Sequence, residues 1–365
     1  MSKKHLLAEL LLGKADTKQL PIDGVFEITP ICNMSCKMCY VRKNQKEVQQ
    51  SGGLKSIDEW LSLAYQAKEK GLLFLLLTGG EIFTYPDFEK LYIELNKMGF
   101  VLSLNTNGTI INESQLDCLV KHPPRSVNIT LYGSSEKTYE KLCGYPQGYK
   151  KTIETILHLK ESGINVNINA SLTPLNIEDF DYILNFTKEH YLAFEASSYM
   201  FPLVRKENDG SFIRFDAKEA ALYAWHIRES INSPMELKEL KESYIHELTF
   251  NSEKDTNQFL KLQCRAGHSS FWITWDGKLT PCGMMSSPYG LPFEEGFESA
   301  WIRVVQEVKK IRLSSKCANC TSRRVCQVCA AKAYAETGHF DGTPSYLCTI
   351  TKEMNYLVTG TSPSL

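Results

Sequence analysis

The chain has 365 residues, of which 43% are apolar and 23% are charged, and its formal net charge is −1 at pH 7. A chain of this length can bury a large core and is predicted to hold more than one domain. The near-zero net charge does not indicate a bulk surface for nucleic acid or anionic lipid, and no apolar run approaches the roughly 20 residues that span a bilayer. We therefore expect neither nucleic acid nor a membrane among the partners of this chain.

The N-terminal stretch, residues 1–21, is basic and contains a short apolar run that Glu9 interrupts. Because it lacks a small-residue cleavage site, we interpret it as an amphipathic lead-in helix and not as a signal peptide. Twelve cysteines in a chain without a secretion signal are unusual, and ten of them fall into spaced groups. In a reducing cytosol such cysteines bind metal more often than they form disulfides. The predicted location is cytoplasmic.

The first cysteine group is Cys32, Cys36 and Cys39, at the spacing CxxxCxxC, directly after an apolar run over residues 24–30 that predicts a strand. Three thiolates this close can hold an iron–sulfur cluster, with one of its four irons left without a protein ligand. A zinc site with a distant fourth ligand is an alternative, and so is a set of buried structural thiols.

The next elements form a helix and a second strand. Residues 56–70 carry apolar residues at helical spacing, with Ser56 as a predicted N-cap and Gly71 at the C-terminal end. Residues 72–77 form a continuous apolar run, which is typical of a parallel strand buried on both faces. This run leads into Gly79-Gly80-Glu81, and paired glycines let a backbone approach a ligand closely.

A cysteine loop after one strand and Gly-Gly-Glu after the next resemble the radical S-adenosylmethionine (SAM) enzymes. The resemblance implies that Cys32, Cys36 and Cys39 hold a [4Fe–4S] cluster whose open iron binds the methionine part of SAM. It also implies that the backbone of Gly79, Gly80 and Glu81 meets the amino group of SAM.

The alternation of strands and helices continues through residue 199. Helices are predicted over 86–98, 112–121, 134–142 and 148–162, and strands over 100–106, 126–132, 165–172 and 192–199. Such alternation implies a parallel sheet. The predicted fold class is therefore α/β, and the resemblance implies a partial (β/α)6 barrel over residues 22–205.

By the same resemblance, several polar residues at the strand ends would bind the cofactor, although each could equally be a turn or cap residue. Asn105, Thr106, Asn107 and Ser171 would line its ribose and methionine, and Tyr40 would lie near the adenine. Ser134 belongs to a stretch, residues 131–135, that in the family often precedes an arginine facing the cofactor. Here Cys143 takes that place.

The C-terminal part carries the other cysteine groups. After a charged, largely helical bridge over residues 206–262, the cysteines follow as Cys-x17-Cys, then CxxCx5CxxC, then Cys. This series resembles the SPASM extension of radical SAM enzymes, which holds two auxiliary [4Fe–4S] clusters, and we assign it to residues 263–355, with a flexible tail at 356–365. The resemblance assigns Cys317, Cys320, Cys326 and Cys348 to the distal cluster, and Cys264, Cys282 and Cys329 to the proximal one. The chain would thus hold three clusters.

Two departures from the family pattern concern the proximal cluster. Only Gln327 and Val328 separate the last two cysteines of the central block, where the family usually has three residues, and Ser269 and Ser270 stand where some members carry a further cysteine. The proximal cluster is therefore expected to have an open iron or an unassigned ligand. His268 is a candidate for that ligand, although a surface histidine is the more common role.

Two cysteines lie outside these groups. Cys118 falls in a helix and is expected in the core. Cys143 ends a helix that should point toward the barrel mouth. Its thiol is a candidate hydrogen-atom donor to a substrate radical, and a buried small side chain is the alternative.

The resemblance implies reductive cleavage of SAM to a 5′-deoxyadenosyl radical, which takes a hydrogen atom from a substrate. Auxiliary clusters that accept an electron favour a net oxidation. The leading hypothesis is a maturase that installs a carbon–carbon, thioether or ether crosslink in a ribosomally made peptide. The alternatives are peptide epimerisation, with Cys143 or Cys118 as the hydrogen-atom donor, and small-molecule dehydrogenation, and an electron carrier is a non-enzymatic one. Sulfatase maturation is disfavoured because Gly283 occupies the position of its acidic base.

The expected partners follow from the same resemblance. They are the peptide substrate and a flavodoxin or ferredoxin as electron donor. Because only about 20 residues precede the first predicted strand, the family's leader-binding module is expected to be missing or supplied by a separate leader-binding protein.

Overall fold

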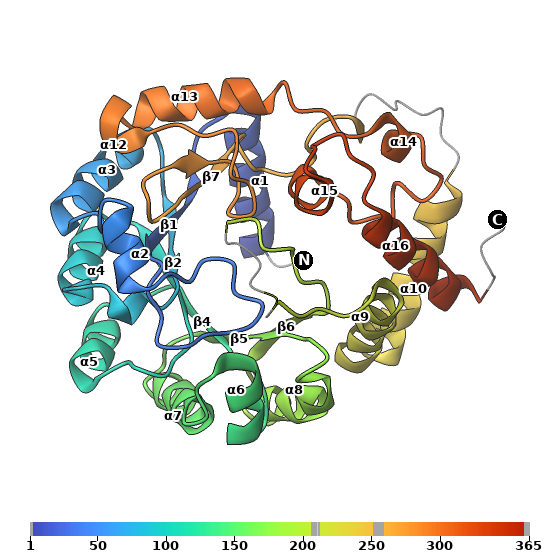
Figure 1. Ribbon diagram of the computed structural model, residues 1–365, viewed down its shortest axis with the longest axis horizontal. Coiled ribbons are helices and arrows are strands. Elements are labelled where there is room, and N and C mark those ends of the chain that lie inside the picture. Colours follow the sequence, from blue (N-terminus) through green and yellow to red (C-terminus); the bar gives the residue numbers. More distant parts are fainter. Residues whose placement is uncertain (1–2, 206–209, 211, 251–258, 361–365) are drawn as a thin grey trace.

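The computed structural model describes residues 3–205, 210, 212–250 and 259–360, and gives side chains from residue 11 onward. Its centre is one sheet with the strand order β6-β5-β4-β3-β2-β1-β7-β8 (Figure 1). The strands are β1 (Asp23–Thr29), β2 (Phe74–Gly79), β3 (Val101–Thr106), β4 (Ser126–Thr130), β5 (Val166–Ser171), β6 (Ala193–Ser197), β7 (Ser270–Ile273) and β8 (Leu279–Thr280). Strands β1–β6 pair in parallel with their sequence neighbours, which confirms the predicted α/β fold with an open, partial barrel.

Helices cover the outer face of these strands (Figure 1). They are α3 (Ile57–Glu69), α4 (Phe88–Lys97), α5 (Glu113–Lys121), α6 (Glu136–Cys143), α7 (Gly148–Glu161) and α8 (Phe180–Glu189), with short 3₁₀ turns at η1 (Ile82–Thr84) and η2 (Ile177–Asp179). The predicted start of α3 is confirmed, because Ser56 and Glu59 form a reciprocal capping box. Apolar side chains of the strands and helices, such as Phe26, Trp60 and Leu77, are fully buried between the two layers.

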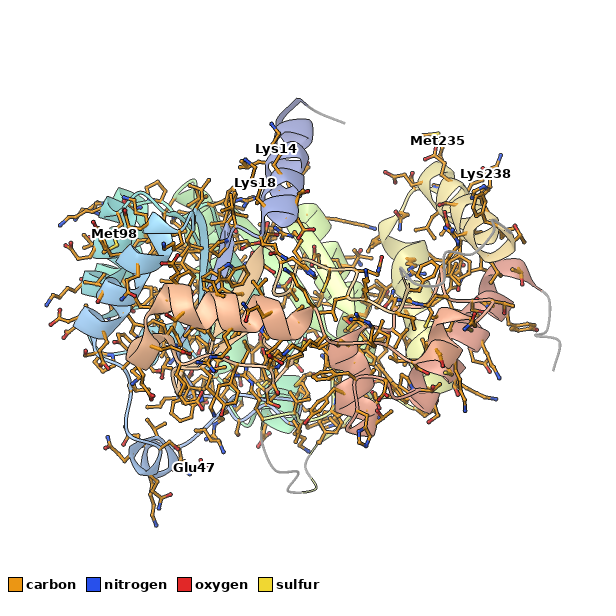
Figure 2. All side chains as sticks on the ribbon, turned by 90° about the horizontal axis from the view of Figure 1, so that it is seen from above. Lys14, Lys18, Glu47, Met98, Met235 and Lys238 are labelled. Atoms are coloured by element: carbon orange, nitrogen blue, oxygen red, sulfur yellow. The ribbon has the colours of Figure 1, made fainter. Side chains whose placement is uncertain are left out.

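Two helices project from opposite faces of the barrel. Figure 2 shows α1 (Lys3–Lys18), with Lys14 and Lys18, on one face and α2 (Gln45–Gln50), with Glu47, on the other. Because α1 precedes β1 and α2 follows the loop after β1, the α2 face is the one where the strands end. This is the face where parallel α/β barrels place their chemistry.

The C-terminal part contributes two strands to the sheet. Strand β7 pairs in parallel with β1, and β8 pairs antiparallel with β7. In the sequence, residues 271–275 look like a strand and the following Asp276-Gly277 predicts a two-residue hairpin turn, but the turn is wider. The Thr274 backbone N–H donates to the Lys278 carbonyl at 2.9 Å, and the Thr274 hydroxyl donates to Asp276 Oδ1 at 2.5 Å. These bonds end β7 at Ile273, short of the predicted Trp275.

Two further helices, α12 (Pro292–Glu295) and α13 (Phe297–Val308), pack against α3, and α13 also contacts β8. The remaining helices flank the open side of the barrel (Figure 1) and are α9 (Ala217–Ile231), α10 (Pro234–Thr249), α14 (Ser315–Ala318), α15 (Ala330–Thr337) and α16 (Ser345–Thr359). Trp225 of α9 packs with Met354 and Val358 of α16 in a separate apolar cluster.

The predicted helical bridge is helical in α9 and α10, while residues 206–209, 211 and 251–258 lie outside the described part. Helix α16 continues to Thr359, past residue 355, after which the sequence predicts a flexible tail. The domain boundaries themselves stay predictions. No described helix is both long and apolar enough to cross a bilayer.

The ends of β1 and β2 approach each other unusually closely. The pairing of β1 with β2 shifts register between Glu27 and Thr29. A Cβ atom on Gly79 would lie 2.2 Å from the Thr29 carbonyl oxygen, and one on Gly80 would lie 2.6 Å from the carbonyl oxygens of Pro30 and Ile31. Both glycines are therefore required by backbone sterics, independent of any ligand.

We predict that Gly79→Ala destabilises the fold by about 1–3 kcal/mol or more, because the clash is with backbone and cannot be relieved by a side-chain rotation. Chemical denaturation followed by circular dichroism measures the change. Gly13→Ala is the matched control: a Cβ atom on Gly13 would meet nothing within 4 Å, so this variant should leave stability unchanged or raise it by up to about 1 kcal/mol. Equal stability of the Gly79→Ala variant and the wild type would contradict the steric requirement for glycine at position 79.

Candidate functional site

The loop after β1 is fixed by backbone hydrogen bonds on two sides. On one side, the Gly80 N–H donates to the Thr29 carbonyl at 2.8 Å and the Glu81 N–H donates to the Ile31 carbonyl at 2.9 Å. On the other side, the loop reaches the end of α6, where the Cys143 carbonyl accepts from the Ser35 N–H at 2.8 Å. The cysteine-bearing segment is thus held between the end of β2 and the end of α6.

A cavity of about 330 Å³ opens where these strands end. It brings together eight of the residues singled out in the sequence, namely Cys32, Cys36, Cys39, Tyr40, Gly79, Gly80, Asn107 and Ser171. Residues without a predicted role complete its wall, namely Met34, Met38, Val41, Tyr132, Ser197, Tyr199, Met200, Phe201 and Met284. We call this the cysteine cavity.

Hydrogen-bond donors surround the sulfur atoms of the cysteine cavity. The Met34 N–H points at Cys32 Sγ at 3.3 Å, and the Arg42 N–H points at Cys39 Sγ at 3.4 Å. The Asn107 amide nitrogen lies 3.6 Å from Cys32 Sγ. Donors of this kind favour thiolates and are one of the means by which proteins adjust iron–sulfur clusters.

The pKa values of two thiols differ for physical reasons. Burial raises the pKa of Cys32 to about 12, because a buried thiolate without a compensating cation is unfavourable. A hydrogen bond with the Cys143 thiol lowers the pKa of Cys36. A cationic cluster would supply the compensating charge, so the donor set fits three cluster ligands.

The described residues contain no group of three or more His, Cys, Asp or Glu that could hold a single metal ion. This finding is compatible with a cubane cluster. Each cysteine binds its own iron there, so the sulfur atoms need not converge on one point as they must around zinc.

Three predicted cofactor residues lie behind the cavity wall. Glu81 is buried and accepts hydrogen bonds from the Asn107 N–H and the Thr106 hydroxyl, both at 2.7 Å. Burial raises the pKa of Glu81 to about 7. The Asn105 amide donates toward the Thr78 hydroxyl at 3.5 Å and accepts from Asn128 at 2.9 Å. In this structure these side chains brace the strand ends, and their contact with a cofactor stays a prediction.

Ser134 is also not among the residues that line the cysteine cavity. Its hydroxyl donates to Asp179. Cys143 is completely buried, with its thiol against Cys36, and burial raises its pKa. Cys143 therefore faces a predicted cluster ligand and does not line the cavity. Cys118 lies in the core on α5, as the sequence predicts.

A second cavity, of about 180 Å³, is lined by Cys264, Cys282 and Cys329. These are the three cysteines that the resemblance assigns to the proximal auxiliary cluster, and they come from segments before β7, after β8 and before α15. Arg323 also lines this cavity and is 8% exposed. His268 does not line it, and its Nδ1 lies 3.2 Å from the Cys264 carbonyl.

Two of the four cysteines assigned to the distal cluster lie in one apolar cluster. Cys317 and Cys326 pack in one cluster with Leu347, the residue before Cys348, and burial, together with the charges of Cys317, Cys326 and Cys320, raises the pKa of Cys348. The Thr351 hydroxyl donates to Cys326 Sγ at 3.2 Å.

One ion pair inside the barrel is not among the features predicted from the sequence. Arg205 binds the Glu27 carboxylate with both terminal nitrogens, at 3.0 and 2.7 Å, and Trp272 Nε1 donates to the same carboxylate at 3.0 Å. The Arg205 guanidinium also lies over the Tyr40 ring at 5.1 Å. Glu27 is 1% exposed, and its charge within the otherwise uncharged run of residues 24–30 was the signal that could have revealed a buried carboxylate.

Two proteins similar in sequence cover most of the chain. The AdoMet-dependent heme synthase of Methanosarcina barkeri is 23% identical, over 86% of this chain and 93% of that protein. The antilisterial bacteriocin subtilosin biosynthesis protein AlbA of Bacillus subtilis is also 23% identical, over 82% of this chain and 64% of AlbA. The chain thus spans somewhat less than two thirds of AlbA.

The fold matches a solved structure over almost its full length. The crystal structure of Streptococcus suis SuiB superposes with a TM-score of 0.69 at 19% identity, covering 95% of this chain and 83% of SuiB. A model of the radical SAM superfamily matches residues 26–187, which include the cysteine loop, Gly79-Gly80 and strands β2–β5. This match identifies residues 26–187 as a radical SAM domain and confirms the predicted resemblance to the radical SAM enzymes.

Proposed function

We propose that this chain is a radical SAM maturase that installs an oxidative crosslink in a ribosomally made peptide. The observation that carries the proposal is the cysteine cavity, in which Cys32, Cys36 and Cys39 face the glycine backbone of residues 79 and 80. When bound there, a [4Fe–4S] cluster with SAM supplies a 5′-deoxyadenosyl radical that abstracts a hydrogen atom from the substrate.

The residues of the cavity would bind and orient the cofactor. Cys32, Cys36 and Cys39 would hold the cluster, and Gly79 and Gly80, which line the same cavity, would present their backbone to the amino group of SAM. Apolar walls from the methionines and from Phe201 would exclude water from the reacting atoms. The roles proposed for Tyr40, Asn107 and Ser171 rest on their position in the same wall.

Two auxiliary clusters would complete the cofactor set, held by the two C-terminal cysteine groups described above. Met284 supports an electron-accepting role for the proximal one, because it lines the cysteine cavity and follows Cys282 by two residues. The described lining of the second cavity offers three cysteines and no His, Asp or Glu, which supports an open iron in the proximal cluster.

A peptide substrate is supported by the roles of similar proteins. AlbA takes part in biosynthesis of the bacteriocin subtilosin, and SuiB has been solved bound to its precursor peptide SuiA, with a TM-score of 0.64 to this chain. A flavodoxin or ferredoxin as electron donor, a separate leader-binding protein and a cytoplasmic location belong to the same proposal.

A heme-forming activity is the second candidate, because the chain covers 93% of the M. barkeri heme synthase and only 64% of AlbA. This candidate replaces the peptide with a tetrapyrrole, a small molecule. Peptide epimerisation is less well supported, since a hydrogen-atom donor must reach the substrate. Cys143 faces Cys36, and the cysteines that line the cysteine cavity are the predicted cluster ligands.

We predict that replacing Cys32, Cys36 and Cys39 together with alanine removes the iron of one cluster and abolishes release of 5′-deoxyadenosine. Iron analysis and chromatography of the anaerobically reconstituted protein measure both quantities. Cys118→Ala is the control, because this thiol lies in the core on α5, and it should retain iron and cleavage. Retained SAM cleavage in the triple variant would contradict the assignment of the cluster.

We predict that the reconstituted enzyme, with reductant and SAM in deuterated water, removes two hydrogens from a peptide encoded beside its gene. Intact mass spectrometry detects this loss. A gain of one deuterium with no other change would instead indicate epimerisation. Heme formed from an iron-porphyrin precursor, with every peptide unchanged, would replace the proposal with the heme-forming alternative.

A further inference from the structure

The sheet ends at β6, and this edge has no strand beside it among the described residues. Strand β6 pairs with β5 alone and is the terminal strand of the order given above. The opposite side of the barrel differs, because β7 and β8 pair beyond β1. The free edge of β6 therefore presents unpaired backbone groups, which are a template for another extended chain.

The pairing with β5 identifies the groups on the free edge. The Ser197 carbonyl accepts from the Leu172 N–H at 2.9 Å, so the backbone groups of Ser197 face β5. Successive residues of a strand point their N–H and C=O groups to alternate sides. The N–H and C=O groups of Phe194 and Ala196 therefore point outward, away from the sheet.

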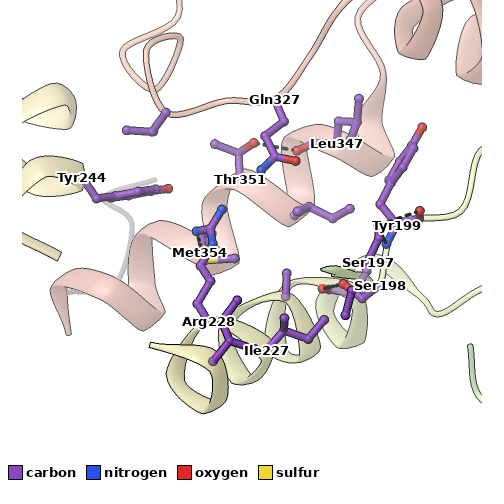
Figure 3. Close-up of a pocket in the computed structure, with 16 residues that line it drawn as sticks. Ser197, Ser198, Tyr199, Ile227, Arg228, Tyr244, Gln327, Leu347, Thr351 and Met354 are labelled. Carbon is purple, nitrogen blue, oxygen red and sulfur yellow. Dashed lines mark hydrogen bonds between the residues drawn. The ribbon is translucent and has the colours of Figure 1, made fainter. Parts of the chain in front are cut away.

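A cavity of about 280 Å³ lies next to this edge, between β6, α9 and α16 (Figure 3). Its apolar wall comes from Ala220, Ala224, Ile227 and Ile231 of α9 and from Leu347, Ile350 and Met354 of α16. Ala196 and Ser197 of β6, with Ser198 and Tyr199 directly after the strand, form its opposite side. Because Ser197 and Tyr199 also line the cysteine cavity, the two cavities adjoin. We call the new one the edge cavity.

Arg228 is the one charged residue among the described residues that line the edge cavity. It is half-buried, and Figure 3 shows it extending from α9 toward Met354 of α16. Its guanidinium makes a weak contact, from Nη1 to Met354 Sδ at 3.7 Å, and no described carboxylate pairs with it. An arginine in such a place suits a carboxylate, which it can bind through two parallel hydrogen bonds.

We propose that the edge cavity is where the peptide substrate docks, as an added strand on β6 with an acidic side chain on Arg228. This inference rests on the proposed peptide-modifying function. Main-chain hydrogen bonds to Phe194 and Ala196 give affinity for any extended peptide, and the apolar wall and Arg228 select its side chains. A strand lying along β6 passes Ser197 and Tyr199 and thus reaches the cysteine cavity.

The test uses the full-length, cluster-loaded chain. Peptides that bind this protein are first selected from a random display library and then labelled with a fluorophore. Hydrogen exchange followed by mass spectrometry should show that a bound peptide protects the segment containing Phe194 and Ala196. Protection elsewhere with none over β6 would overturn the proposal. This measurement needs no variant and does not depend on catalysis.

Two variants test the separate contacts by fluorescence anisotropy. Ala196→Pro removes an outward N–H that the sheet does not use, a position where edge strands tolerate proline, and should weaken peptide binding by about tenfold or more. Arg228→Gln should weaken acidic peptides by about tenfold and their amide analogues far less. Arg303→Gln, an exposed arginine on α13, is the matched control. Equal affinity of wild type and Arg228→Gln for acidic peptides would overturn the role of Arg228.

The docking proposal and the proposed peptide maturation can be disproved independently of each other. Protection of β6 by a peptide whose mass never changes would support docking and count against peptide maturation by this chain. A peptide that loses two hydrogens without protecting β6 would overturn docking alone.

Discussion

The contact between the ends of β1 and β2 is the constraint on which the site depends. The Gly80 and Glu81 N–H groups donate to the Thr29 and Ile31 carbonyls, and the close approach of these carbonyls leaves no room for side chains at Gly79 and Gly80. The cysteine loop leaves β1 at this point, so its first residues take their direction from the end of β2. Glu81 then ties the end of β3 to the same place through the Asn107 N–H. A change at this junction therefore moves the cysteines, the glycine backbone and the end of β3 together.

Inside the barrel, the ion pair of Glu27 with Arg205 connects β1 to further parts of the chain. A carboxylate that is 1% exposed needs compensation, and it receives two hydrogen bonds from Arg205 and one from Trp272. Trp272 belongs to β7, whose pairing with β1 is the reason that this ring reaches the barrel interior. Arg205 in turn covers the ring of Tyr40, which directly follows Cys39. The C-terminal part is thus linked to the cysteine loop by charge and hydrogen bonding as well as by the sheet.

Local patterns in the sequence predicted single helices and strands better than they predicted which distant segments pair with each other. The apolar run at 72–77 and the Ser56 cap identified β2 and the start of α3, because burial and capping are properties of short segments. The hairpin signal at Asp276-Gly277 could not reveal that β7 pairs with β1, since strand pairing between distant segments depends on the whole fold. Arg205 and Glu27 are 178 residues apart, so the charge at Glu27 could mark a buried carboxylate but could not identify Arg205 as its partner. The site shows the same division. The spacing of Cys32, Cys36 and Cys39 indicated a shared site, whereas the position of Cys143 depended on packing at the end of α6, which turns its thiol toward Cys36 and away from the cavity.

The asymmetry of the barrel explains why one side remains open. Strand β7 occupies the edge of β1, and the end of β1 is where the cysteine loop needs a fixed backbone. A further strand on β6 would complete the sheet, but it would also fill the edge cavity and cover the route past Ser197 and Tyr199. Helices α9 and α16 instead stand off from β6, and their separation from it forms the cavity that Figure 3 shows. The unpaired edge carries a risk of aggregation that proteins usually limit by covering or charging such strands. Its short length and its position behind two helices reduce that risk, while its outward N–H and C=O groups remain available beside the site.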